Sequence, residues 1–94
     1  MDKNSFPADA IIIDVRTKEE FDQERVKGAL NIDLMSPVFM KEIQKLDQSK
    51  PYLLYCRSGN RSGQAEMIMR QIGFLKVQNL GGIPEVREIF GTEF

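Results

Sequence analysis

The chain has 94 residues, enough for one domain, and its 13 basic and 14 acidic residues leave a formal net charge of −1. This balance, without any block of lysines or arginines, predicts no nucleic-acid partner and no polybasic membrane anchor. No apolar run approaches the ~20 residues of a membrane span, and residues 1–5 do not resemble a signal peptide. We therefore expect a cytoplasmic protein as the sequence stands, or a periplasmic one if a leader has been removed.

The first part of the chain predicts a buried strand followed by a short helix. Residues 10–15 form a continuous apolar run, which is typical of a strand covered on both faces in a parallel sheet. Thr17 and Glu20 have the spacing of a capping box, so a helix should begin after Thr17 and carry Phe21 toward the core.

The next segment predicts a second helix after an irregular connection. Gly28 breaks the pattern, and residues 29–32 are compatible with either a brief strand or an extended loop. Ser36 followed by proline indicates an N-cap with proline in the first turn, and the apolar spacing continues to about Leu46. A helix is expected over that segment.

The second half repeats the alternation of strand and helix. Residues 52–55 are strand formers, a helical pattern follows and ends at Gly73, residues 77–80 predict another strand, and Pro84 lies near the start of a last short helix. Such an order implies one α/β domain over residues 1–94, with three layers (α/β/α) and a small, mostly parallel central sheet.

The cysteine and histidine content restricts the chemistry. The chain has a single cysteine, Cys56, and no histidine. A Cys-His dyad is therefore excluded, one thiolate is too few for a zinc site, and neither an intramolecular disulfide nor a CxxC pair can form. We predict no metal and no cofactor, so a reaction at Cys56 needs a thiolate activated by its surroundings.

Cys56 lies where a strand is predicted to pass into a helix, in a loop that resembles an anion cradle. Arg57 and Arg61 flank Gly59, and Ser62 is expected to start the helix. Free N–H groups at a helix start, the helix dipole and nearby guanidinium groups all favour a thiolate over a thiol of pKa ~8.5. A merely structural cysteine gains nothing from such neighbours, so this pattern favours catalysis.

Two further polar residues close the first strand at the same edge of the predicted sheet. Asp14 and Arg16 could orient the Cys56 loop, or they could form a strand-end salt bridge with no catalytic part. The residues alone leave both interpretations open.

Four segments together resemble the family of single-domain rhodaneses, in particular its short type. The loop pattern C-x-x-G-x-R is the most specific of them. The chain departs from the family by lacking the Gly-His that commonly precedes the Gly-Ala pair and the tryptophan that often follows the paired glycines. The matching segments are Ile13-Asp14-Val15-Arg16 with Glu20-Phe21, Lys27-Gly28-Ala29-Leu30-Asn31-Ile32, Tyr55-Cys56-Arg57-Ser58-Gly59-Asn60-Arg61-Ser62, and Gly73-Phe74 with Val77-Gln78-Asn79-Leu80-Gly81-Gly82.

The resemblance implies a rhodanese-like fold and a thiosulfate sulfurtransferase. Cys56 would take the outer sulfur of thiosulfate as a persulfide and pass it to cyanide or another thiophilic acceptor. The loop would bind the substrate, with Arg57 meeting the sulfonate and Arg61 bracing the loop through carbonyls or the carboxylate of Asp14 or Glu20. The implied substrate-binding residues are Arg57, Ser58, Gly59, Asn60, Arg61 and Ser62, with Asp14 and Arg16 in support.

Two other functions use a similar loop. A cysteine phosphatase or arsenate reductase places five residues between cysteine and arginine, whereas four separate Cys56 from Arg61, and no aspartic acid is recognisable as a general acid. A persulfide carrier or sulfide-responsive module would deliver sulfur to a protein acceptor through the same loop. Met67 and Met69 could hint at a partner surface, but their spacing places one in the core and one toward solvent, so we interpret both as packing residues.

Overall fold

The computed structural model describes residues 3–94, so the first two residues of the expected domain lie outside the described part. A four-stranded, all-parallel sheet has the order β2-β1-β3-β4. This agrees with the expected α/β class. The strands are β1 (Ile11–Asp14), β2 (Leu30–Asn31), β3 (Pro51–Tyr55) and β4 (Lys76–Asn79); the helices are the 3-10 helix η1 (Lys3–Ser5), α1 (Lys18–Gln23), α2 (Phe39–Gln44), α3 (Asn60–Gln71) and α4 (Ile83–Phe90).

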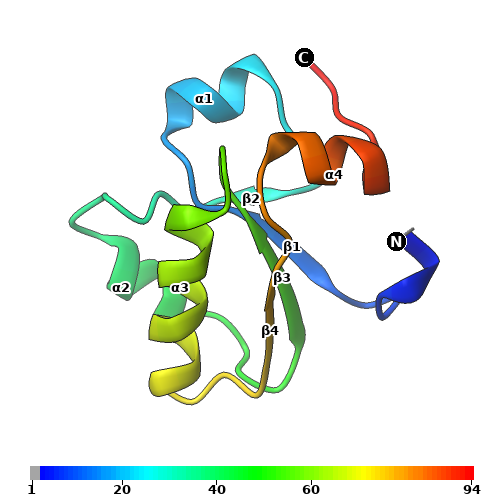
Figure 1. The fold of residues 1–94 in the computed structure, drawn as a ribbon. Helices are drawn as coiled ribbons and strands as arrows, with labels where there is room; N and C mark the ends of the chain where they lie inside the picture. Colours follow the sequence, from blue (N-terminus) through cyan, green and yellow to red (C-terminus); the bar gives the residue numbers. More distant parts are fainter. Residues whose placement is uncertain (1–2) are drawn as a thin grey trace.

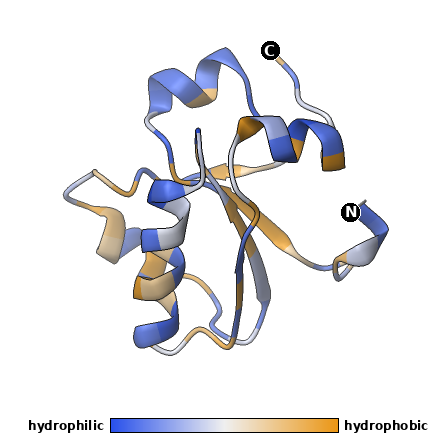
Figure 2. Ribbon diagram, in the orientation of Figure 1, coloured by the Kyte–Doolittle hydropathy of each residue, from blue (hydrophilic) through white to orange (hydrophobic). Residues whose placement is uncertain are grey.

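Helices cover both faces of the sheet, which gives the predicted three layers. Helices α2 and α3 lie on one face and α4 on the other, while α1 lies over the carboxyl ends of the strands (Figure 1). The larger core cluster includes Ile13, Leu54 and Met69, and the smaller one, under α4, includes Tyr55 and Val86. The apolar colour of the central strands in Figure 2 reflects burial on both faces.

Parallel register brings the ends of three strands to one edge. Asp14 at the end of β1 pairs with Tyr55 at the end of β3, and Leu54 pairs with Asn79 at the end of β4. Because parallel strands share one direction, the segments that follow them meet at the same edge. This edge lies at the top of Figure 1.

Most predicted elements are present, with small shifts of their ends. The segment expected to be a strand or a loop contains the two-residue strand β2. Thr17 and Glu20 form the predicted capping box, and Gly73 follows the C-cap of α3 with a φ of +117°. The left-handed conformation at Gly73 explains why the helix ends there.

Two local predictions were wrong. Helix α2 begins at Phe39 with Val38 as its N-cap, so Pro37 precedes the helix. Ser36 instead accepts a hydrogen bond from the Val38 N–H at 3.2 Å, a local turn that competes with helical capping. Phe21 is half-buried beneath Arg25 and belongs to neither core cluster. Helix α1 therefore covers the strand ends without inserting a buried side chain.

Across residues 3–94, no helix is long and apolar enough to cross a membrane.

Candidate active site

Cys56 directly follows β3, and its side chain is fully buried at the start of α3. The Gly59 N–H donates to its Sγ at 3.0 Å, and the Ser62 Oγ lies 3.3 Å from the same sulfur. The predicted position beneath a helix N-terminus is therefore observed.

Two opposing effects act on the pKa of Cys56. Burial raises it, because a thiolate loses solvation. Hydrogen bonds from the hydroxyl and N–H of Ser62, and from the N–H groups of Ser58 and Gly59, lower it and outweigh the burial. The loop backbone and Ser62 thus account for the lowered pKa more directly than the flanking arginines, to which the sequence analysis gave equal weight.

The loop can converge on one sulfur atom because Gly59 adopts a left-handed conformation. Its φ is +102°, and it acts as the N-cap of α3 without a side-chain cap. Ser62 was expected to start the helix, but the helix begins at Asn60. Ser62 lies inside the first turn, fully buried, with its Oγ 3.3 Å from Cys56 Sγ.

The turn between β4 and α4 holds the loop from one side. The Cys56 N–H donates to Gly81 O at 3.1 Å, and the Ile83 N–H donates to Arg57 O at 3.2 Å. The backbones approach so closely that a Cβ on Gly82 would lie 2.2 Å from Arg57 O. The paired glycines therefore allow two neighbouring turns to touch.

Arg61 is held by Glu20, one of the two carboxylates that the sequence left open. Its guanidinium donates to both carboxylate oxygens, at 2.8 and 3.1 Å. Hydrogen bonding from Arg61 is the main cause that lowers the pKa of Glu20 to about 2. Glu20 also completes the capping box of α1, so one side chain joins α1 to the loop. Arg61 is thus placed as the predicted brace.

Asp14 and Arg16 form a buried strand-end pair. Arg16 Nη2 lies 2.6 Å from Asp14 Oδ2, and the Arg16 Nε–H donates to both carboxylate oxygens. Arg16 also donates to the Glu24 carbonyl and lies over the Tyr55 ring. Within residues 3–94 the pair makes no hydrogen bond to residues 57–62. These contacts agree with a strand-end salt bridge, the second of the two interpretations given for this pair.

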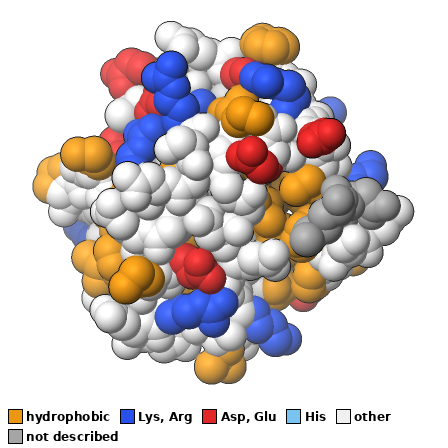
Figure 3. Space-filling view, in the orientation of Figure 1, with side chains coloured by type: hydrophobic (Ala, Val, Ile, Leu, Met, Phe, Trp, Pro, Cys, Tyr) orange, Lys and Arg blue, Asp and Glu red, His pale blue; other side chains and the backbone are white. Residues whose placement is uncertain are grey.

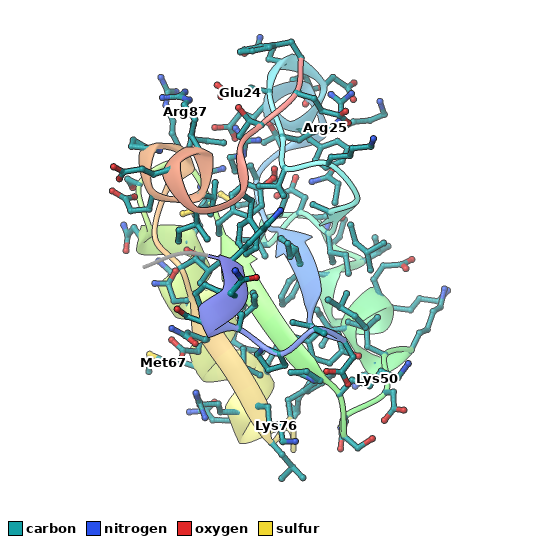
Figure 4. The ribbon with its side chains drawn as sticks, turned by 90° about the vertical axis from the view of Figure 1, so that its right-hand side faces the viewer. Glu24, Arg25, Lys50, Met67, Lys76 and Arg87 are labelled. Carbon is teal, nitrogen blue, oxygen red and sulfur yellow. The ribbon has the colours of Figure 1, made fainter. Side chains whose placement is uncertain are left out.

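Arg57 lines a cavity of about 510 Å³ between α1 and α4. Its side chain is exposed and has no hydrogen bond or ion pair to any described residue. Arg16 and Arg87 also line the cavity, and Glu24 binds Arg87 on its wall at 2.9 Å (Figure 4). Charged side chains gather over this end of the molecule in Figure 3. The cavity therefore carries, on the residue that follows Cys56, a guanidinium with no ion pair to the described residues.

Of the other loop residues, Ser58 acts on Cys56 through its backbone N–H. Ser58 and Asn60 are exposed, and neither side chain is hydrogen-bonded to any of residues 3–94. Met69 is fully buried and Met67 is 63% exposed. This confirms the expectation of one inward and one outward methionine, but the interpretation of Met67 as a packing residue is wrong.

Asn79 is a site residue that the sequence analysis missed. Its side chain donates to Gly59 O at 3.0 Å and accepts from the Ser62 hydroxyl at 2.6 Å. The signal available in the sequence was an asparagine, a residue depleted in strands, at a strand end two residues before the paired glycines.

The fold and site define a parallel α/β domain with a cysteine loop built to hold an anion. The model of the Rhodanese-like domain family matches residues 2–88. The chain therefore belongs to the rhodanese family, as the sequence motifs indicated.

Relatives and a solved structure agree with this assignment. The chain is 36% identical over 74 residues to the thiosulfate sulfurtransferase PspE of Escherichia coli (strain K12), covering 79% of this chain and 71% of that protein. It is 32% identical over 80 residues to the putative sulfur carrier protein YrkF of Bacillus subtilis (strain 168), covering 85% of this chain but only 41% of that protein. A rhodanese with anions from E. coli has a TM-score of 0.69 and 35% identity over 81% of this chain and 89% of that one.

Proposed function

We propose that the protein is a thiosulfate sulfurtransferase that works through a persulfide on Cys56. The thiolate attacks the outer sulfur of thiosulfate, the S–S bond of thiosulfate breaks, and sulfite leaves with the electron pair. Cyanide or another thiophilic acceptor then attacks the outer sulfur of the persulfide, and the thiolate is regenerated. Neither step needs a general acid, because sulfite and thiolate are tolerable leaving groups.

The observation that carries this proposal is the set of donors around a single buried sulfur. The Gly59 N–H and the Ser62 hydroxyl lie at 3.0 and 3.3 Å from Cys56 Sγ. The Gly59 N–H is held in place by the backbone, and the Ser62 hydroxyl can rotate its hydrogen to a charged sulfur. Donors of this kind stabilise the negative end of a persulfide and the charge that develops during transfer. The backbone N–H groups of Ser58 and Ser62 act on the same sulfur.

Arg57 and the cavity that it lines provide a place for the sulfonate group of thiosulfate. An exposed guanidinium that has no partner among residues 3–94 can meet a sulfonate or another anionic group. The cavity of about 510 Å³ is much larger than a thiosulfate ion, so it also leaves space for an acceptor. Arg61 is held by Glu20 and acts by bracing the loop.

A persulfide carrier that hands sulfur to a protein acceptor is the second candidate. The full burial of Cys56, which would protect a stored persulfide, favours it, as does the likeness to a putative sulfur carrier protein. A phosphatase is disfavoured by the four-residue spacing between Cys56 and Arg61, because a loop that draws its donors around one atom would crowd the oxygens of a phosphoryl group.

The first test is incubation with thiosulfate followed by intact-protein mass spectrometry. We expect the mass of one sulfur atom to be added, to be removed by cyanide, and to be absent in Cys56→Ser. An unmodified wild-type protein would contradict sulfur transfer altogether. Steady-state turnover of thiosulfate and cyanide then separates the catalyst from a carrier that loads once and does not turn over. Faster hydrolysis of aryl phosphates than sulfur transfer would favour the phosphatase.

A further inference from the structure

Asn79 connects the Cys56 loop to the end of β4 through both ends of its side-chain amide. Nδ2 donates to the carbonyl of Gly59 at 3.0 Å, and Oδ1 accepts from the N–H of Gly81 at 2.9 Å. A carbonyl can only accept and a backbone N–H can only donate, so these two bonds fix which amide atom lies where. The atom that faces Ser62 is therefore Oδ1, which carries no hydrogen.

The Ser62 hydroxyl has a single hydrogen and more than one acceptor within reach. Its Oγ lies 2.6 Å from Asn79 Oδ1, 3.3 Å from Cys56 Sγ and 3.4 Å from Gly81 O. Because Asn79 Oδ1 has no hydrogen, the 2.6 Å bond requires Ser62 to donate there. Ser62 then turns a lone pair toward Cys56, and a lone pair suits an S–H group and repels a thiolate.

We propose that Asn79 is a positioning residue for Cys56: it takes the hydroxyl hydrogen of Ser62 while Cys56 is a thiol, and releases it when Cys56 ionises. In the ionised state Ser62 rotates its hydrogen to the sulfur and gives up its bond to Asn79, while the thiol proton leaves to solvent. The stabilisation that Ser62 gives the thiolate is therefore offset by the bond that it loses. This inference deepens the proposed function, on which its catalytic meaning rests.

The charged groups around Cys56 are held independently of this pair. Arg61, whose charge interacts with Cys56, is bound by Glu20, and Arg16 by Asp14. Arg61 also interacts with Asp33, while Arg57 is exposed. Within residues 3–94 none of these side chains bonds to Asn79 or Ser62. A change at Asn79 therefore alters the direction of the hydroxyl without removing a charge.

The test is the pH dependence of alkylation by iodoacetamide, which reports on Cys56 alone because the chain has no other thiol. Asn79→Leu keeps a side chain of similar size and removes the acceptor. We expect the inflection to fall by about half to one pH unit, the effect of one neutral hydrogen bond. A loosened loop would shift it upward instead, because the Gly59 N–H would be less well placed. An unchanged or raised inflection in a folded variant overturns the proposal.

A double-mutant cycle tests whether the effect passes through Ser62. In a Ser62→Ala background, Asn79→Leu should no longer lower the inflection, and an equal fall there overturns the proposal. Ser62→Ala alone should raise the inflection by less than half a pH unit. A rise of one unit or more would mean that Ser62 donates freely to the sulfur, and this measurement decides the question even if Asn79→Leu fails to fold. Because no sulfur donor is used, failure of the proposed sulfur transfer would leave these outcomes unaffected.

Discussion

Replacing Glu20 by glutamine removes one charge from the pair that braces the Cys56 loop. The amide keeps an oxygen for the Thr17 N–H, which now binds Glu20 Oε1 at 3.2 Å, and glutamine suits the third helical position of a capping box. The bidentate ion pair to Arg61 is lost. Glu20→Gln therefore tests that pair with little change to the cap.

The magnitude follows from the pKa of Glu20, which falls from 4.5 to about 2, mainly through hydrogen bonding to Arg61. Such a difference corresponds to about 3 kcal/mol of free energy of unfolding. The side chains of Arg61 and Glu20 are 24% and 22% exposed. Because solvent screens a partly exposed ion pair, we reduce its contribution to the free energy of unfolding to about 2 kcal/mol. Because the folded-state pKa is the lower one, this contribution is complete above pH 4.5 and disappears as the pH falls toward 2.

Urea unfolding of the wild type and Glu20→Gln across this pH range measures the effect. The gap in free energy of unfolding should be about 2 kcal/mol at neutral pH, and about half of it should be lost by pH ~3. Glu19→Gln is the matched control, because Glu19 is an exposed residue of the same helix without an ion pair to residues 3–94. A gap that does not change with pH, or an equal loss in the control, would refute this reasoning.

Three further predictions concern the loop and its surroundings. Gly82→Ala should destabilise the protein by about 2–3 kcal/mol, because the added Cβ would lie 2.2 Å from Arg57 O. Gly63→Ala inside α3 should instead stabilise the protein by about 0.5–1 kcal/mol. Urea titrations measure both free energies of unfolding, and equal effects of the two substitutions would contradict the steric argument. Arg57→Gln should raise the KM for thiosulfate about tenfold, and Arg87→Gln, whose guanidinium already binds Glu24, should raise it less. One glycine inserted beside Gly59 should reduce sulfur transfer by ~100-fold, because the N–H donors move away from the sulfur; undiminished transfer would show that loop size is unimportant.

The parts of the site that the sequence predicted correctly depend on local patterns. Strand formers, Cys56, a glycine and helical spacing follow one another along the chain, so the strand, loop and helix could be recognised without tertiary contacts. The capping box is equally local, since Thr17 and Glu20 are three residues apart.

The features of the site that could not be predicted from the sequence depend on contacts between side chains that lie far apart in the chain. Arg61 had carbonyls and two carboxylates as candidate partners, and only the fold shows that Arg16 binds Asp14 and leaves Glu20 for Arg61. Asn79 lies 17 residues beyond Ser62, and their contact exists because β4 pairs beside β3. The N-cap predicted at Ser36 failed because two local hydrogen-bonding patterns competed for the same hydroxyl.

The contact between the Cys56 loop and the β4–α4 turn has a consequence for how the domain opens. Two turns that follow different strands are joined by backbone contacts. These are the hydrogen bonds from Cys56 N–H to Gly81 O and from Ile83 N–H to Arg57 O, and the β-bridge between Ser58 and Gly82. Neither turn can separate from the sheet without breaking the backbone bonds of the other. Hydrogen exchange of their amides should therefore give one common free energy of opening, as expected for a single cooperative unit within native fluctuations.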